Sequence, residues 1–99
     1  MTNIRVVRYT TTPEAVAENI DLMSQVFAEL TEVQPAEVRY GTLLLPDENT
    51  FIHVVLTQGE GSPLPALAAF KEFQRDLSSR AVTPPRAATA RLIGNFRLF

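Results

Sequence analysis

The sequence predicts a single α+β domain over residues 1–99, with elements in the order β-α-β-β-α-β. Short runs rich in β-branched and aromatic residues alternate with two segments that place apolar residues at helical spacing. At least three of the predicted strands are also apolar on both faces. Two helices can cover one face of a four-stranded antiparallel sheet, so we expect the other face to pack against a second copy of the chain.

The first strand is predicted for Asn3–Thr10, which carries apolar side chains on both faces. The segment Thr11–Glu14 then has the features of a helix start: a hydroxyl cap, a proline in the first turn and an acid near the positive helix end. The helix should end before Pro35. Its apolar stripe is predicted to consist of Val16, Ile20, Met23, Phe27 and Leu30.

A β-hairpin is predicted next, because two strand-like runs flank a cluster of turn formers. The runs are Glu37–Leu45 and Thr50–Gln58, and the turn formers are residues 46–49. The second run is apolar on both faces, with Phe51, His53 and Val55 on one and Ile52, Val54 and Leu56 on the other.

The remaining elements are a second helix, predicted from Ala66 to about Ala81, and a final strand region, Ala87–Phe99. The final region is too long and mixed for one ideal strand, and Gly94-Asn95 indicates a bulge or bend. Two exposed Phe side chains at a chain end would be unfavourable. We therefore expect the tail Asn95–Phe99 to lie against the partner copy.

Composition argues against several classes of protein. The formal charge is −2 and the basic residues are scattered, so nucleic acid is not an expected partner. The chain has no cysteine, which excludes disulfides, thiolate chemistry and Cys-ligated metals. No segment approaches the roughly 20 apolar residues of a membrane span, and the N-terminal residues lack a signal-peptide pattern, so we expect a cytoplasmic protein.

No cofactor and no metal site are predicted. The run Gly59-Glu60-Gly61 lacks the third glycine and the strand–helix context of a dinucleotide site. The run Asp47-Glu48-Asn49 is interpreted as a turn, because three adjacent residues cannot wrap a calcium ion. One histidine without cysteine does not favour a transition-metal centre.

His53 is the candidate catalytic residue, and it has two interpretations. A lone histidine in an apolar strand can be a core or interface residue held by one or two hydrogen bonds. Alternatively, burial keeps it neutral near pH 7, and a neutral imidazole in an apolar pocket can deprotonate a phenol or steer an enolate toward oxygen. In the neighbouring strand, Tyr40 or Thr42 could approach it if the register aligns them. The candidate ligand-binding residues, placed by alternation on strands or at their ends, are Tyr40, Tyr9, Arg8 and Asn95.

The element order, the strand T-F-I-H-V-V (Thr50–Val55) and the helix A-L-A-A-F-K-E-F (Ala66–Phe73) resemble the antibiotic biosynthesis monooxygenase-like group of the dimeric α+β barrel superfamily. The resemblance implies a ferredoxin-like fold and a homodimer that packs sheet against sheet. It also implies cofactor-independent, quinone-forming oxygenases or haem-degrading enzymes as relatives. The second helix has Phe70 where such enzymes often carry histidine, and this departure argues against the same chemistry. The chain also has no tryptophan, which argues against haem cleavage.

Two hypotheses for the function remain open. The first is a cofactor-independent monooxygenase, or a related small-molecule enzyme, that acts on an aromatic or phenolic ligand in an apolar cavity. His53 would be the base in this case, and Tyr40 or an arginine would orient the substrate. The second is a non-enzymatic dimeric module that binds a small hydrophobic ligand or joins partner proteins. We expect a His53→Ala variant to keep the fold and lose ligand binding.

Overall fold

The computed structural model describes residues 2–47, 49–59 and 62–98. Its elements follow the predicted order, and the second helical region is divided in two. The elements are β1 (Thr2–Thr10), α1 (Val16–Val33), β2 (Val38–Leu44), β3 (Thr50–Gln58), α2 (Ala68–Arg75), α3 (Leu77–Arg80) and β4 (Arg86–Ala90), with 3₁₀ turns at Pro13–Ala15 and Leu64–Ala66.

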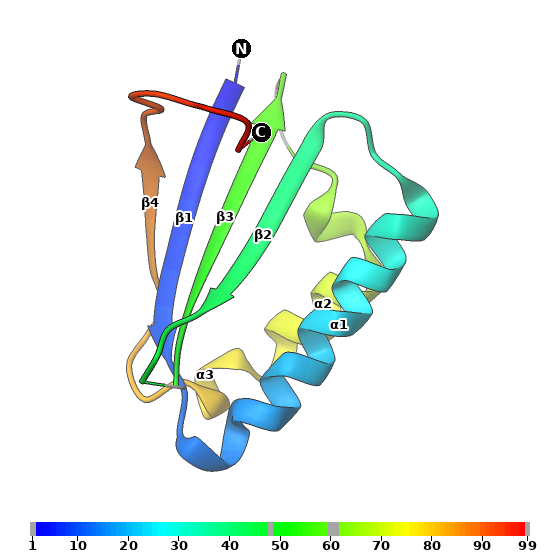
Figure 1. Ribbon diagram of the computed structural model, residues 1–99. Coiled ribbons are helices and arrows are strands. Elements are labelled where there is room, and N and C mark those ends of the chain that lie inside the picture. The colour runs from blue at the N-terminus through cyan, green and yellow to red at the C-terminus, as the bar shows by residue number, and fades with distance from the viewer. Residues whose placement is uncertain (1, 48, 60–61, 99) are drawn as a thin grey trace.

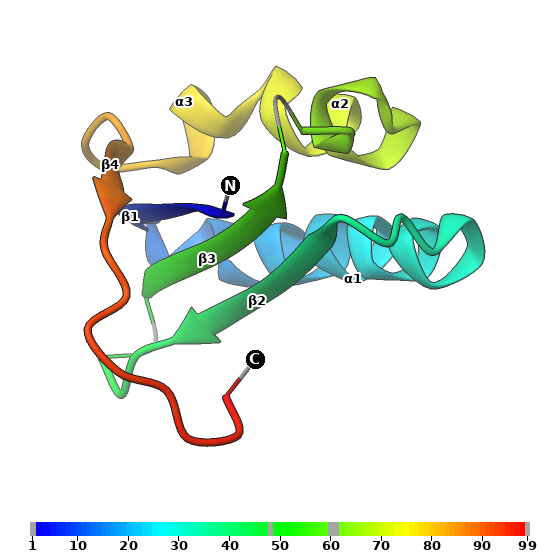
Figure 2. The ribbon, with the colours of Figure 1, turned by 90° about the horizontal axis from the view of Figure 1, so that it is seen from above.

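The strands form one antiparallel sheet in the order β2-β3-β1-β4, and the helices lie on one of its faces (Figures 1 and 2). This arrangement confirms the ferredoxin-like prediction. The register places a row of four residues directly across the sheet, each paired with the next, and all four face the helices: Thr42, His53, Val7 and Ala87. His53 therefore occupies the centre of the helix-facing side.

The core lies between this side of the sheet and the helices. Its fully buried members are Tyr9, Met23, Val26, Phe51 and Phe73. The predicted stripe of α1 is partly wrong, because Ile20 is 44% exposed whereas Asn19 and Val26 are completely buried. The helix is rotated toward Asn19 because this side chain hydrogen-bonds to the buried Tyr9 hydroxyl.

The second helical region breaks at Asp76, which separates α2 from α3. The predicted continuous helix to about Ala81 is therefore corrected to two short helices. The break allows Arg80 to turn inward, where its guanidinium donates to the carbonyl oxygen of Phe73 at 2.6 Å. The carbonyls of the last helical turn lack partners within the helix, and Arg80 satisfies one of them.

The hairpin turn between β2 and β3 is organised by Asp47. Its carboxylate accepts hydrogen bonds from the Asn49 amide at 3.0 Å, the Thr50 amide at 2.9 Å and the Thr50 hydroxyl at 2.6 Å. These bonds, led by that of the Thr50 hydroxyl, lower the pKa of the Asp47 carboxyl. Asp47 therefore acts as a turn residue, as predicted. Three other residues of the two runs interpreted from the sequence lie outside the described residues: Glu48, Glu60 and Gly61.

The face of the sheet opposite the helices, called the outer face below, has an apolar centre and a rim of arginines. Residues pointing to it include the half-buried Val6, Ile52 and Val54, the buried Ile4 and Leu56, and the exposed Arg8, Arg39 and Arg86. In Figure 2 the chain after β4 turns back on this side of the sheet. The apolar surface expected on a second face is therefore present within one chain.

The tail after β4 is irregular and exposes large apolar side chains. β4 ends at Ala90, earlier than the predicted strand region, and the Asn95 side chain accepts a hydrogen bond from the Leu98 amide at 2.9 Å. Ile93, Phe96 and Leu98 are 82%, 78% and 75% exposed; Phe99, which the tail prediction included, lies outside the described residues. Within residues 2–47, 49–59 and 62–98, no helix combines the length and apolar character needed to cross a membrane.

Candidate functional site

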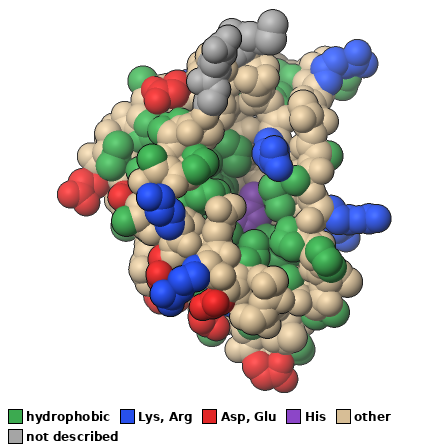
Figure 3. Space-filling view, turned by 180° about the vertical axis from the view of Figure 1, so that it is seen from behind, with side chains coloured by type: hydrophobic (Ala, Val, Ile, Leu, Met, Phe, Trp, Pro, Cys, Tyr) green, Lys and Arg blue, Asp and Glu red, His purple; other side chains and the backbone are tan. Residues whose placement is uncertain are grey.

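A pocket of about 690 Å³ lies between the helix-facing side of the sheet and the α2 region. Strands β1, β2, β3 and β4 all contribute to its floor, and Leu64, Phe70, Phe73 and Leu77 form much of the opposite wall. Figure 3 shows the pocket as a hollow with the purple histidine side chain at its bottom and hydrophobic side chains around it. Its size and apolar character are typical of small-molecule sites.

His53 is at the centre of this floor and is only 3% exposed. Its Nε2 lies 2.7 Å from the Tyr9 hydroxyl, and its Nδ1 lies 2.7 Å from the Tyr40 hydroxyl. The Thr42 hydroxyl approaches the same Nδ1 at 3.2 Å. The ring also packs against Tyr9 and Phe73, with centroid separations of 5.2 and 5.5 Å. Both ring nitrogens are therefore occupied by hydroxyl groups.

The hydrogen bonds continue from Tyr9 into the protein core. Asn19 Nδ2 donates to the Tyr9 hydroxyl at 2.9 Å, and Arg80 Nε donates to Asn19 Oδ1 at 3.1 Å. Arg80 is 3% exposed and its guanidinium also lies over the Phe73 ring, 5.3 Å from the centroid. A buried polar chain thus runs from Arg80 through Asn19, Tyr9 and His53 to Tyr40.

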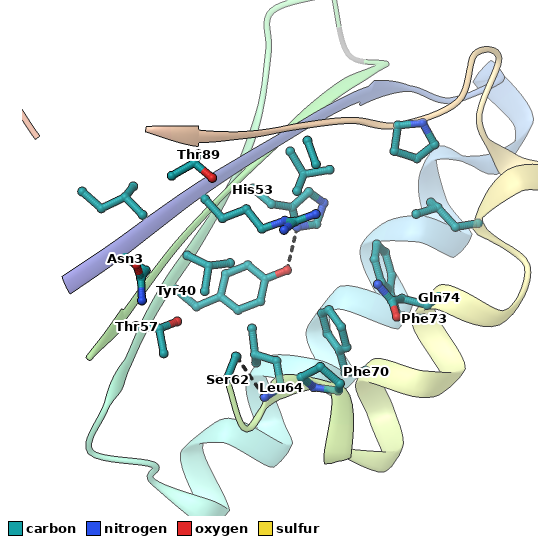
Figure 4. A pocket seen from close by; sticks show the side chains of 18 of the residues that line it. Asn3, Tyr40, His53, Thr57, Ser62, Leu64, Phe70, Phe73, Gln74 and Thr89 are labelled. Atoms are coloured by element: carbon teal, nitrogen blue, oxygen red, sulfur yellow. Dashed lines mark hydrogen bonds between the residues drawn. The ribbon is translucent and has the colours of Figure 1, made fainter. Parts of the chain in front are cut away.

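Tyr40 is the member of this chain that reaches the pocket from β2. Figure 4 shows its hydroxyl hydrogen-bonded to His53, with Phe70 and Phe73 on the helical side of the cavity. Tyr40 and His53 both line the pocket, as does the exposed Arg5 of β1. Among the described lining residues Arg5 carries the only formal charge, so the electrostatic environment favours a ligand with negative or electron-rich oxygen.

Burial shifts the ionisation of all three rings toward their neutral forms. It lowers the pKa of His53 to about 4, because the imidazolium loses its hydration. It raises the pKa of Tyr9 to about 12, although the hydrogen bond from Asn19 and the charge of Arg80 act in the opposite direction. Burial likewise raises the pKa of Tyr40, aided by Tyr9 and opposed by hydrogen bonding with Thr42. At neutral pH the site therefore holds a neutral imidazole between two protonated phenols.

This buried imidazole predicts a pH-dependent loss of stability. The unfolded chain takes up a proton on His53 as the pH falls below 6.5, whereas the folded protein resists protonation until about pH 4. The contribution of the neutral His53 side chain to the free energy of unfolding is complete above pH 6.5. It falls by about 3 kcal/mol in total as the pH is lowered toward 4. Urea unfolding between pH 7.5 and 4 measures it, with His53→Phe as the reference that lacks this component. Equal pH slopes for the two proteins would contradict a buried neutral histidine.

The structure places the sequence-derived candidates in two groups. His53, Tyr9 and Tyr40 meet in one hydrogen-bonded cluster at the pocket. Arg8 pairs with Ile52 and points to the outer face, and Asn95 is an exposed residue of the tail. Because the side chain of each successive strand residue changes face, Arg8 cannot share the pocket with its neighbours Val7 and Tyr9.

Three residues of the site were missed by sequence reasoning: Arg5, Asn19 and Arg80. Arg5 lies two residues before Val7 and four before Tyr9, so its side chain points to the same side of β1 as theirs. This alternation could have identified it. Asn19 lies three residues after Val16 and four before Met23, a spacing that marks a core-facing position. No local signal marks Arg80, because its burial depends on the break between α2 and α3.

The polar side chains of the site do not form a cluster of metal ligands. Within the described part of the chain, no three His, Cys, Asp or Glu side chains gather closely enough to hold an ion. Phe70 packs 6.2 Å from Phe73, centroid to centroid, and lines the pocket with an apolar ring. The hydrogen-bonded polar groups of the pocket floor, Tyr9, Tyr40 and His53, are all strand residues.

Comparison with known proteins gives clear structural matches. A protein from Nitrosomonas europaea, provisionally named an antibiotic biosynthesis monooxygenase, superposes with a TM-score of 0.77 at 8% identity, covering 93% of this chain and 90% of its own. SnoaB from Streptomyces nogalater, a cofactor-independent oxygenase compared in the form of a point mutant, gives 0.70 at 17% identity and 97% of both chains. The fold is that of the antibiotic biosynthesis monooxygenase-like proteins.

A third structure with this monooxygenase-like fold is a dimeric ferredoxin-like protein of unknown function from Jannaschia sp. CCS1. It matches with a TM-score of 0.69 at 7% identity, covering 93% of this chain and all of its own. No family model and no curated protein matches the sequence. The monooxygenase-like fold is thus recognised by its three-dimensional arrangement, at a low level of sequence identity.

Proposed function

We propose that the protein is a cofactor-independent monooxygenase that acts on a small aromatic or phenolic substrate in the pocket above His53. The observation that carries this proposal is the Tyr40 hydroxyl, held by His53 Nδ1 at 2.7 Å and lining an otherwise mainly apolar cavity of about 690 Å³. A flat aromatic ring system suits the apolar walls. Its oxygen would hydrogen-bond to Tyr40 and face the positive charge of Arg5.

The geometry gives His53 an indirect role in this reaction. A direct base needs a free lone pair within reach of the substrate, whereas both nitrogens of His53 already contact tyrosine hydroxyls. The structure therefore favours electrostatic stabilisation: Tyr40 and Arg5 lower the free energy of the ionised substrate, and His53 holds Tyr40 in place.

The proposed chemistry needs no external reductant. An anthrone-type substrate has an activated CH₂ group beside a ring system that stabilises its enolate. The enolate carbon forms a bond to O₂, the O–O bond then breaks, and R₂CH₂ + O₂ becomes R₂C=O + H₂O. The substrate supplies all four electrons that reduce O₂, so the protein has only to bind, orient and stabilise the oxyanion. The fold shared with SnoaB, described as a cofactor-independent oxygenase, supports this proposal.

Oxygen uptake during incubation with anthrone tests the proposal. We expect uptake above the uncatalysed rate and a product containing one oxygen atom from ¹⁸O₂. The Tyr40→Phe variant keeps the ring but loses the hydroxyl, so its kcat/KM should fall by about 10- to 100-fold. The conservative Phe27→Leu change on α1 is the control, since Phe27 packs behind Tyr40 and is absent from the pocket lining. No uptake with a panel of electron-rich phenols would overturn the enzymatic proposal.

A second function, ligand binding without turnover, is favoured by one observation. The pKa of His53 near 4 and the engagement of both its nitrogens leave the described lining of the pocket without a free base. A binding module would retain affinity for aromatic ligands in the absence of oxygen consumption. Titration calorimetry beside the uptake assay separates the two: binding without uptake supports the module, and uptake supports the enzyme.

We also propose that the working unit is a homodimer in which two outer faces pack together. The support is the apolar centre of that face and the exposed apolar tail, with Ile93 82% and Phe96 78% exposed. The matched Jannaschia protein is described as dimeric. A stable interface of this kind usually buries about 2,000 Å² or more. A pocket that opens on the helical side remains available in such a dimer.

A further inference from the structure

The series of hydrogen bonds from Arg80 to Tyr40 has a direction, because the group at its buried end, the Arg80 guanidinium, can only donate. A guanidinium has no acceptor atom, so Arg80 Nε donates to Asn19 Oδ1 at 3.1 Å. This contact determines the orientation of the Asn19 amide: its Nδ2 group faces Tyr9 and donates to the hydroxyl oxygen at 2.9 Å. The direction is therefore set at the buried end, by two residues that are not part of the pocket lining.

The direction continues through Tyr9 to His53. With an Asn19 N–H already pointing at its oxygen, the Tyr9 hydroxyl donates its own proton to His53 Nε2 at 2.7 Å. The opposite arrangement would leave a buried phenol proton without an acceptor, which costs about 1–3 kcal/mol. A neutral imidazole carries one proton, so that proton is on Nδ1. His53 Nδ1–H then donates to the Tyr40 oxygen at 2.7 Å.

We propose that Asn19 and Arg80 are positioning residues that direct the Tyr40 hydroxyl proton into the pocket, so that the site selects ligands with an accepting oxygen, either a carbonyl or a phenolate. The Tyr40 oxygen accepts a hydrogen bond from His53 Nδ1–H, and its own hydroxyl hydrogen is directed to the ligand. This inference rests on the proposed function, because it specifies the ligand chemistry of the same pocket. It assigns a role to two buried residues that do not contact the ligand.

The nitrogen-bound proton of His53 provides a test that needs neither a ligand nor turnover. Two-dimensional ¹⁵N NMR of the ring in the full-length protein at pH 7 distinguishes the two tautomers, and the assignment is simple because the chain has one histidine. We expect the proton on Nδ1 and a lone pair on Nε2. A proton on Nε2 in the wild-type protein would overturn the inference, whatever the outcome of the oxygen-uptake assay.

The Asn19→Asp variant reverses the direction of the hydrogen bonds between position 19 and Tyr40. A carboxylate can only accept, so Tyr9 must donate to the new carboxylate and His53 must donate from Nε2 to Tyr9. His53 Nδ1 must then accept a hydrogen bond, which the Tyr40 hydroxyl at 2.7 Å is better placed to donate than the Thr42 hydroxyl at 3.2 Å. In the described part of the chain Arg80 has no carboxylate partner within ion-pair distance, so the new carboxylate pairs with a buried charge and the fold should persist. We expect the ¹⁵N signals of the two ring nitrogens to exchange character. Gln25→Glu, the same chemical change on the exposed side of α1, should leave them as in the wild type.

A matched ligand pair tests the consequence for selection. Fluorenone has only an accepting oxygen, whereas fluorenol has nearly the same shape and can also donate. In Asn19→Asp a lone pair of the Tyr40 oxygen faces the pocket, so fluorenone loses its hydrogen bond whereas fluorenol can donate one. The ratio of the fluorenone Kd to the fluorenol Kd should therefore rise about 10-fold or more over wild type, which corresponds to a hydrogen bond of about 1.4 kcal/mol. An unchanged ratio would overturn the claim that Asn19 sets ligand choice. A changed ratio without oxygen uptake by the wild type would support this inference while the oxygenase proposal fails.

Discussion

Replacement of His53 by alanine is expected to lower the free energy of unfolding by about 3–5 kcal/mol. The substitution leaves a cavity against Tyr9 and Phe73, on which the ring now packs. It also removes the hydrogen-bond partner of two tyrosine hydroxyls. Chemical denaturation at pH 7 measures the loss. The expectation from sequence, that this variant keeps its fold and loses only binding, is therefore revised, because the imidazole is a structural centre as well as a pocket residue.

A His53→Phe variant separates packing from hydrogen bonding. The phenyl ring fills most of the space but pairs with neither hydroxyl. We therefore expect the free energy of unfolding of His53→Phe to lie about 1–3 kcal/mol below that of the wild type, a smaller loss than in His53→Ala. Ligand affinity should fall in both variants, because Tyr40 loses the group that orients it. Wild-type stability in His53→Ala would show that the rings around His53 are not tightly packed and would contradict the described geometry.

Replacement of Val54 by glutamate is expected to convert the proposed dimer into a monomer. Val54 points to the outer face near the centre of β3, where the opposing sheet would cover it. Burial of an unpaired carboxylate in an apolar interface costs several kcal/mol, which corresponds to a rise in the dimer Kd of about 100-fold or more. Sedimentation velocity at micromolar concentration measures the assembly, and wild type should sediment with about twice the chain mass.

Val33→Glu is the matched control, because Val33 is 53% exposed at the end of α1, on the helical side of the sheet. It should remain dimeric with an unchanged fold. Deletion of residues 95–99 should weaken the dimer without unfolding the chain, since the described part of the tail is exposed in the single chain. A wild-type protein that sediments as a monomer, or a Val54→Glu protein that stays dimeric, would overturn outer-face dimerisation.

Much of the fold could be predicted because its signals are local. Thr50–Gln58 is a strand in both descriptions, since β-branched and aromatic residues alternate there between turn formers. The helix ending at Val33 is likewise bounded by a nearby proline and a left-handed residue, Gln34. The break at Asp76 escaped prediction because it depends on Arg80 reaching back to the Phe73 carbonyl, a contact formed only in the folded chain.

The site shows the same division between local and tertiary information. The sequence by itself determined that His53 shares one face of an apolar strand with Phe51 and Val55, and that Tyr40 and Thr42 share one face of the adjacent strand, because side chains alternate with a period of two. Both faces of the His53 strand are apolar, so the face that turns toward the helices was decided by the tertiary structure. Only the tertiary structure decided the register that sets Thr42 opposite His53, and the rotation of α1 that buries Asn19. Register and helix rotation are set by the packing of distant segments, which no local pattern encodes. Together they connect Arg80 to Tyr40 at the pocket through three hydrogen-bonding side chains, those of Asn19, Tyr9 and His53.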